Sequence, residues 1–400
     1  MPKPPAPPER FRTAFDELHE VVAARIGASD FGDDDYRLGL EVLLESMDYD
    51  ATFTEQGRRA AWGGLIDALG SRAIAFRSMA ENPGYDRQLI DRPVVIIGVP
   101  RTGTTALHKL MAVDPQFQGL EKWLLAAPMP RPPRDTWETH PYFQKEVDEL
   151  NARFGATPQQ RAAHNMVAEE VDECLWLQRQ TFVSNFWPCG WSAATYDAWW
   201  QCQDEMPSYR YLRRGLQLIG SNDPGKRWLL KNPSHVLHLD LLFAVFPDAL
   251  VIHTHRDPAK AVPSLCALLM QGYPAMEKGR KDQRAHTMIR RETAKWAHGL
   301  RKCEPVREAH RAQVLDVIHG DFHRDPMATI GRIYGFLGLD LTPAVEAAMA
   351  ARIAAAPEAA HGVHSYDVAD FGVTEDEIRE GFGSYIDQFD LRPALKGARP

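Results

Sequence analysis

The sequence lacks any long apolar run, and none of its hydrophobic stretches approaches the roughly 18 residues that a membrane-spanning helix needs. Its start, MPKPPAPPER, is rich in proline and lacks the apolar centre of a secretory signal. We therefore expect a cytoplasmic protein with a short disordered lead and no integral membrane segment.

Cysteine is scarce, and the five cysteines include no C-x-x-C pair. An odd number without metal-ligand spacing favours free thiols in a reducing compartment over disulfides or a structural zinc site. Excess positive charge is also absent, because the formal net charge is −8. This balance argues against nucleic acid as a partner.

What is present describes an ordinary globular chain of 400 residues, 44% hydrophobic and 25% charged. That length allows two or three domains of about 150 residues, or one large α/β unit with additions. We expect a helical region over residues 1–91, an α/β core over 92–340 and a C-terminal helical tail over 341–400 that packs on the core. The core would contain a helical and proline-rich insertion over about 116–227.

One stretch organises the chain, PVVIIGVPRTGTTALHKLM at residues 93–111. Its apolar run over 94–97 predicts a strand buried on both faces, and a helical pattern follows the glycine loop at 98–105. A strand, a glycine loop and a helix start together point backbone N–H groups at an anion. The loop resembles a P-loop, except that Thr104 replaces the lysine and a cation stands inside the loop as Arg101.

Three further short apolar runs predict strands, over residues 228–230, 250–252 and 314–318. A helix follows each of them, and we expect the side chains of Ser234, Asp257 and Asp321 to cap these helices. Strands that alternate with helices predict a parallel doubly wound sheet.

Helices are also predicted outside this core, over residues 10–26, 58–79, 143–154 and 167–180. The segment that follows is rich in aromatic residues, which could pack a helical layer on the sheet or line an apolar acceptor pocket. These residues are Phe182, Phe186, Trp187, Trp191, Tyr196, Trp199 and Trp200.

Cations follow three of the predicted strands: Arg101, Lys231 and Arg256. Ligands of open α/β sheets bind at the carboxyl ends of the strands, so this register predicts a site for a multiply anionic ligand. Pro263 falls inside the helix after Arg256 and must kink it, which could turn the hydroxyl of Ser264 toward that ligand.

Three motifs together carry a family resemblance: PRTGTT, LKNPSH, and THRDP with Ser264. They resemble sulfotransferases that use 3′-phosphoadenosine-5′-phosphosulfate (PAPS), and most closely the bacterial branch of long single-chain enzymes. That branch also shows text like SDFGDD, DEC and HSYDVADFGVTEDEIREGF. The resemblance implies a P-loop-like α/β fold, a parallel sheet flanked by helices, with an N-terminal helical cap and a helical insertion.

The resemblance also implies residue roles. Arg256 and Ser264 would hold the 3′-phosphate, and Arg101 and Lys231 would neutralise charge on the bridging oxygen without a metal. The 5′-phosphosulfate would lie in the loop formed by Pro100, Arg101, Thr102, Gly103, Thr104 and Thr105.

The residue that takes the proton of an acceptor alcohol is left open. Related enzymes use His or Glu, so Glu121 and His164 are equal candidates and Glu173 is a weaker one. His253 and His255 alternate along a strand and resemble a metal pair only superficially.

The composition of the aromatic stretch favours a small apolar or phenolic acceptor. Two other functions compete with this one, a P-loop-type small-molecule kinase or NTPase and a non-catalytic nucleotide-binding scaffold.

Overall fold

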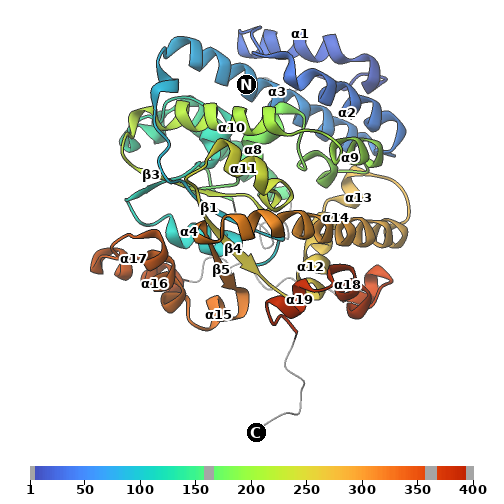
Figure 1. Ribbon diagram of the computed structural model, residues 1–400. Coiled ribbons are helices and arrows are strands. Elements are labelled where there is room, and N and C mark those ends of the chain that lie inside the picture. Colours follow the sequence, from blue (N-terminus) through green and yellow to red (C-terminus); the bar gives the residue numbers. More distant parts are fainter. Residues whose placement is uncertain (1–4, 157–165, 356–366, 393–400) are drawn as a thin grey trace.

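In the computed structural model, a parallel five-stranded sheet lies at the centre of the molecule and helices flank it (Figure 1). The structure describes residues 5–156, 166–355 and 367–392. The strand order is β2-β3-β1-β4-β5. The strands are β1 (Val94–Gly98), β2 (Phe117–Gln118), β3 (Arg227–Lys231), β4 (Leu250–His255) and β5 (Val314–Ile318). The predicted α/β class and all four predicted strands are confirmed.

β1 is the middle strand, and all five of its residues are buried. Val95 and Ile97 face a large core shared with the N-terminal helices and the insertion. Val94 and Ile96 face a smaller core closed by helices near the C-terminus. Burial on both faces explains why this strand is a continuous apolar run. β2 was missed, because two residues leave no recognisable pattern.

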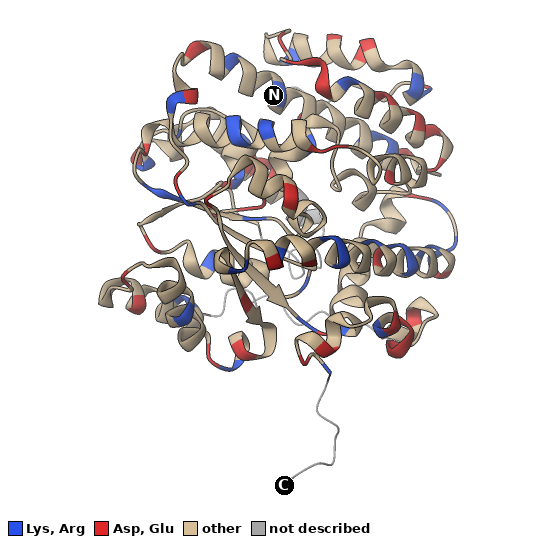
Figure 2. Cartoon of the chain, viewed as in Figure 1, with Lys and Arg blue, Asp and Glu red and all other residues tan. Residues whose placement is uncertain are grey.

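The N-terminal region forms a layer of helices across one side of the sheet (Figure 1). It contains α1 (Phe15–Ile26), α2 (Arg37–Tyr49) and α3 (Glu55–Glu81), and the short turns η1 (Phe11–Thr13), η2 (Asp34–Tyr36) and η3 (Tyr85–Arg87). The Thr54 side chain caps α3 by accepting from Gly57 N at 2.9 Å. Both acidic and basic residues occur on these outer helices in the view of Figure 2.

The helices that follow the strands position the loops. They are α4 (Thr104–Met111), η8 (Pro233–His238) with α11 (Leu239–Val245), α12 (Pro258–Met270), and α15 (His319–Arg324) with α16 (Pro326–Leu337). Asp257 caps α12 as expected.

The other two expected caps are wrong. Asn232 rather than Ser234 accepts from a backbone N–H at the start of η8, and Asp325 rather than Asp321 caps α16. In both cases the residue directly before a proline makes the cap, because proline fills the first helical position without needing a partner for an N–H.

The insertion is mostly short helices. They are α5 (Lys122–Ala126), η4 (Arg134–Thr139), α6 (Pro141–Ala156), α8 (Leu175–Gln178), η5 (Arg179–Thr181), η6 (Trp187–Cys189), α9 (Ala194–Trp200), α10 (Met206–Ile219) and η7 (Gly220–Asn222). The helix expected over 143–154 is confirmed as α6, but the one expected over 167–180 is wrong. There, Asp172 N donates to Leu120 O at 2.8 Å and Cys174 N donates to Lys231 O at 3.0 Å. These bonds tie the segment to the strand ends, so only its last part is helical.

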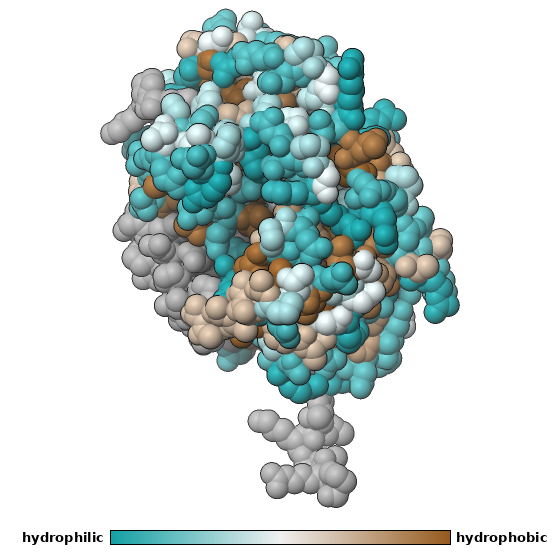
Figure 3. Space-filling model, turned by 90° about the vertical axis from the view of Figure 1, so that its left-hand side faces the viewer, coloured by the Kyte–Doolittle hydropathy of each residue, from teal (hydrophilic) through white to brown (hydrophobic). Residues whose placement is uncertain are grey.

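The C-terminal half adds α13 (Tyr273–Met276), α14 (Lys281–Ala309), η9 (Arg311–Gln313), α17 (Pro343–Ala355), η10 (Val368–Phe371), α18 (Glu375–Phe382) and α19 (Tyr385–Gln388). Among the described residues, no helix combines the length and the apolar character that crossing a bilayer requires. Figure 3 shows the side of the molecule that lies on the left in Figure 1. Its surface is largely hydrophilic, with apolar residues gathered near the middle.

Candidate active site

The loop after β1 has a backbone that few residue types can adopt. Gly98, Arg101 and Gly103 have φ values of 146°, 72° and 93°. A Cβ on Gly98 would lie 2.4 Å from Thr254 Oγ1, so glycine is required there. Arg101 is not a glycine, and its left-handed conformation costs free energy.

The threonines of the loop have different partners. Thr102 is buried, and its hydroxyl donates to Val99 O at 2.7 Å and lies 2.6 Å from Thr254 Oγ1. This hydroxyl therefore closes the loop. Thr104 and Thr105 begin α4, where backbone N–H groups without intrahelical partners favour an anion.

The cation after β4 meets the loop after β1. Arg256 Nη1 donates to Arg101 O at 2.8 Å, and Arg101 Nε donates to Ser264 Oγ at 3.1 Å. Ser264 directly follows Pro263 inside α12. Three residues that the sequence singled out are therefore joined, although 163 positions separate the first from the last.

The cation after β3 lies beside the same loop. Lys231 is buried, forms an ion pair with Glu173, and donates to Thr105 Oγ1 at 3.3 Å. Glu173 precedes Cys174, whose N–H bonds to Lys231 O. The DEC segment thus places a carboxylate against the lysine at the carboxyl end of β3.

One cavity of about 1160 Å³ is lined by Arg101, Thr105, Glu173 and Arg256. Lys231 and Ser264 lie behind this lining, bonded to Glu173 and Arg101. The polar end of the cavity contains the loop, Glu173, Arg256 and Ser234. Its apolar part is lined by residues from several elements, including Val22, Ile26, Ala60, Gly64, Ile74, Leu150, Met166, Leu265, Leu268 and Met276. α1 and α3 therefore form a wall of the cavity, although the N-terminal helices were expected only to cap the main domain.

The aromatic stretch divides between the two expected roles. Phe186, Trp187 and Trp191 line the cavity, together with Trp176 and Trp296 from other elements. The remaining members pack in or against the core, namely Phe182, Tyr196, Trp199 and Trp200.

The structure separates the candidate bases. Glu121 lines a second cavity, of about 770 Å³, and its Oε2 accepts from Arg131 Nη2 at 3.0 Å and from Nε at 3.2 Å. Burial raises the pKa of Glu121, while Arg131 opposes that shift. Glu173 lies beside Lys231 in the main cavity. His164 lies outside the described residues.

Two histidines that sequence reasoning missed also line the main cavity, His319 and His323. They begin and continue α15, directly after β5, so the strand-end rule that found the three cations could have found them. Their ring centroids are 4.2 Å apart. Burial, with Arg256, His323 and Arg101 nearby, lowers the pKa of His319 to about 3. Its ring is therefore neutral at pH 7.

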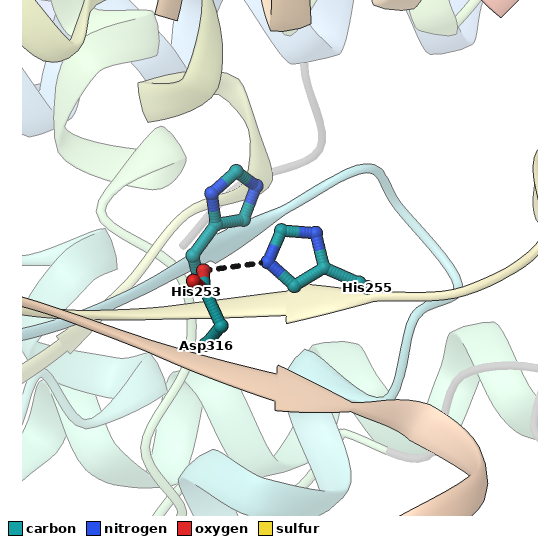
Figure 4. A group of neighbouring side chains, drawn as sticks. All are labelled: His253, His255 and Asp316. Atoms are coloured by element: carbon teal, nitrogen blue, oxygen red, sulfur yellow. Dashed lines mark hydrogen bonds and ion pairs between the residues drawn. The ribbon is translucent and has the colours of Figure 1, made fainter. Parts of the chain in front are cut away.

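His253, His255 and Asp316 form a group with metal-ligand spacing, the one such group among the described residues (Figure 4). Asp316 already accepts from His255 Nε2 at 2.8 Å and from Arg307 Nη2 at 2.7 and 2.9 Å. A cation that competes with Arg307 for both oxygens would be poorly accommodated, so we interpret the group as a structural network. Burial lowers the pKa of His253, which keeps its ring neutral.

The family follows from a direct comparison. The model of the Sulfotransferase family matches residues 93–343, which include the loop and all three strand-end cations. The chain belongs to the sulfotransferase family. Within this family, a curated relative is omega-hydroxy-beta-dihydromenaquinone-9 sulfotransferase Stf3 of Mycobacterium bovis and Mycobacterium tuberculosis, 26% identical over 264 residues. That match covers 63% of this chain and 64% of the relative, so it spans less than two thirds of the relative's length.

Two solved structures of this family cover nearly the whole chain. Sulfotransferase STF1 from Mycobacterium tuberculosis H37Rv is 36% identical, with a TM-score of 0.82 over 92% of this chain and 98% of its own. Sulfotransferase STF9 from Mycobacterium avium is 27% identical, with a TM-score of 0.85 over 94% of this chain and 97% of its own. Coverage this high means that each match includes most of the chain outside residues 93–343 as well.

Proposed function

We propose that this sulfotransferase transfers the sulfuryl group of PAPS to a hydroxyl of an apolar acceptor. The observation that carries the proposal is the placement of Arg101 and Arg256 at one end of a cavity that also has apolar walls, with buried Lys231 bonded to two residues that line that end, Glu173 and Thr105. An anionic donor and an apolar acceptor would share this cavity.

The residues present fit the donor. The loop at Gly98–Thr105 leaves room for a phosphosulfate, since two of its residues are glycines with positive φ. The N–H groups of Gly103, Thr104 and Thr105 would bind the 5′-phosphate, each such charge-assisted bond contributing roughly 1.5–3 kcal/mol. Arg256 and Ser264 would bind the 3′-phosphate, with His319 beside them.

In the proposed reaction, the acceptor oxygen attacks sulfur in line as the bond from sulfur to the bridging oxygen breaks. The sulfuryl group moves to the acceptor, and adenosine 3′,5′-bisphosphate leaves with the electron pair. Lys231 and Arg101 stabilise the negative charge that builds on the bridging oxygen. Arginine stays protonated throughout, so its role is electrostatic.

Glu173 is the base that the geometry favours. Its carboxylate lines the main cavity and is held against Lys231, whereas Glu121 is engaged by Arg131 in the second cavity. Glu173 would accept the hydroxyl proton as the oxygen attacks. Lys231 can hold this carboxylate and Thr105 at once, because an ammonium has three N–H donors.

The acceptor class follows from the lining of the cavity. Helices α1 and α3 and the aromatic residues of the insertion provide apolar walls, with charged residues such as Arg25 and Asp67 among them. A lipid-like alcohol or a phenol fits such walls. The curated relative carries a hydroxylated dihydromenaquinone in its name, which supports the same class.

A ligand-binding test separates this function from a P-loop kinase. The melting temperature is measured in EDTA with adenosine 3′,5′-bisphosphate, and separately with Mg-ATP. The bisphosphate should stabilise the protein by RT ln(1 + [L]/Kd), about 2.7 kcal/mol at a hundredfold excess over Kd. Stabilisation by Mg-ATP alone would refute the donor assignment.

A transfer assay separates catalysis from mere binding. Labelled PAPS is incubated with alcohols and phenols of increasing apolar size, and labelled product is counted. We expect turnover that rises with apolar size. Binding of the bisphosphate without transfer to any acceptor would favour the non-catalytic scaffold.

A further inference from the structure

The two neighbours of Arg256 in the sequence are both held by side chains from the C-terminal segment. Tyr385 Oη lies 3.0 Å from His255 Nδ1. Arg379 donates to both carboxylate oxygens of Asp257, at 3.3 Å from Nε and 2.7 Å from Nη2. In Figure 1, α18 and α19 lie beside α12, near the end of β4.

The contact at His255 has a defined direction. His255 Nε2 faces Asp316 Oδ1 at 2.8 Å, and a carboxylate can only accept, so Nε2 carries the hydrogen. Burial lowers the pKa of His255, so the ring is neutral and Nδ1 accepts from the hydroxyl of Tyr385. Phe389 stacks on the same ring, with centroids 3.8 Å apart and planes within 14°. Two side chains of the C-terminal segment, Tyr385 and Phe389, therefore hold the last residue of β4 in place.

The contact at Asp257 is a two-point, charge-assisted pair. The side chains of Arg379 and Asp257 are only 15% and 8% exposed, so water weakens this pair less than it weakens a surface pair. Asp257 Oδ1 also accepts from Ala259 N at 3.0 Å and thereby caps α12. One carboxylate thus joins the C-terminal helix α18 to the start of the helix that presents Ser264.

We propose that the C-terminal segment from Glu375 to Phe389 is a positioning clamp for the 3′-phosphate site, with Arg379 and Tyr385 as positioning residues. The inference rests on the proposed function. Arg256 lies between His255 and Asp257 in the sequence, and its guanidinium donates to Arg101 O at 2.8 Å. Small shifts of its backbone would therefore move the guanidinium away from the loop and weaken recognition of the 3′-phosphate in particular.

Two variants loosen the clamp in different ways. Arg379→Ala removes the guanidinium. Asp257→Asn removes the charge but keeps a good capping residue for α12, so it separates the clamp from the cap. Arg392→Ala is the matched control. Arg392 follows the clamp segment and pairs with Asp387 inside it at 3.3 Å, and both side chains are about two thirds exposed.

The readout is calorimetric affinity for adenosine 3′,5′-bisphosphate and for AMP, which lacks the 3′-phosphate. We expect both clamp variants to weaken the bisphosphate about tenfold, which corresponds to about 1.4 kcal/mol, and AMP less than about twofold. The variant with both Arg379→Ala and Asp257→Asn should lose no more affinity for the bisphosphate than either single variant, since both substitutions remove the same ion pair. Arg392→Ala should bind both ligands like the wild type.

A merely structural tail would lower the melting temperature without changing the ratio of the two affinities. An unchanged ratio in Arg379→Ala and in Asp257→Asn would therefore overturn the clamp. Tyr385→Phe, which keeps the ring, should shift the ratio in the same direction if the clamp holds. A wild-type protein that binds AMP as tightly as the bisphosphate would instead refute the donor assignment, before any variant is compared.

Discussion

At the residue scale, Arg101 combines a left-handed backbone with a side chain to which we assign a role in the donor site. Its φ of 72° is one that glycine adopts freely and other residues adopt at a cost of roughly 1–2 kcal/mol. Its side chain bonds to Ser264 and its carbonyl accepts from Arg256. The strain is therefore tolerated for the placement of the guanidinium.

The pair Arg101→Gly and Arg101→Ala separates these two effects. Both variants remove the guanidinium, so both should lose most sulfuryl transfer. Only glycine relieves the backbone, so Arg101→Gly should unfold with a free energy about 1 kcal/mol higher than Arg101→Ala in urea titrations. Equal stability of the two variants would show that the loop is unstrained at this position.

The choice of base is tested by Glu173→Gln. The amide keeps the size of the side chain but cannot take a proton at neutral pH, so turnover should fall by roughly 10²- to 10⁴-fold. Glu121→Gln is the control. It should retain turnover within about threefold but lose about 1–3 kcal/mol of stability, because Arg131 loses a buried charged partner. A larger loss of turnover in Glu121→Gln than in Glu173→Gln would show that Glu121 is the base.

The positions of site residues could be predicted from the sequence where each residue directly follows a recognisable strand. Arg101, Lys231 and Arg256 each follow a recognisable strand, and parallel strands bring their carboxyl ends to one edge. Glu121 and Glu173 were candidates only through the resemblance to related enzymes, because no local pattern shows which carboxylate reaches the cavity. Cys174 bonds to the end of β3, and nothing in the local sequence of the DEC segment indicates that contact.

At the element scale, α3 is both a core helix and a wall of the cavity. Its residues Ala60, Gly64 and Ser71 are small and line the cavity along one side of the helix. A Cβ on Gly64 would meet no atom within 4 Å, so the helix tolerates a larger side chain there. That freedom allows the volume of the acceptor site to be changed without disturbing the fold.

Filling the cavity at Gly64 should change acceptor selectivity. Gly64→Leu should raise KM for large apolar acceptors several-fold and leave affinity for adenosine 3′,5′-bisphosphate unchanged, because the donor loop is formed by other residues. Gly335→Leu is the matched control, since Gly335 is an exposed helical glycine outside the cavity, also with no atom near its Cβ position. Unaltered KM values across a series of acceptor sizes would place the acceptor elsewhere.

Elements with a clear apolar pattern were predictable, and irregular or two-residue elements were not. α3, α6 and four strands have the apolar spacing expected of them, and their predicted positions agree with the structure. The helix expected over 167–180 failed because its backbone bonds go to neighbouring strands. Caps failed where a proline shifted the helix start, at Asn232 and Asp325.

At the scale of the whole molecule, buried ionisable groups of opposite type set the pH dependence of stability. Burial lowers the pKa of four histidines from 6.5, to about 3 for His108, His235 and His319 and to about 4 for His238, and raises that of Glu205 from 4.5 to about 8. Between about pH 3 and 6.5 the unfolded histidines bind protons that the folded ones do not, so stability falls as the pH drops. Between about pH 4.5 and 8 folded Glu205 keeps a proton that the unfolded chain loses, so its contribution falls as the pH rises.

The two effects together predict a maximum of stability near pH 6.5. Below it, these histidines outweigh the single glutamate, and unfolding free energy should decrease toward pH 5. Above it, the histidines are neutral in both states, and Glu205 should lower stability by about 1.4 kcal/mol per pH unit up to about pH 8. Urea titrations from pH 5 to 8 measure this curve in the wild type and in Glu205→Gln. The variant should lose the decline on the alkaline side and keep the acid one, and a variant curve parallel to the wild type above pH 6.5 would contradict a protonated Glu205 in the folded protein.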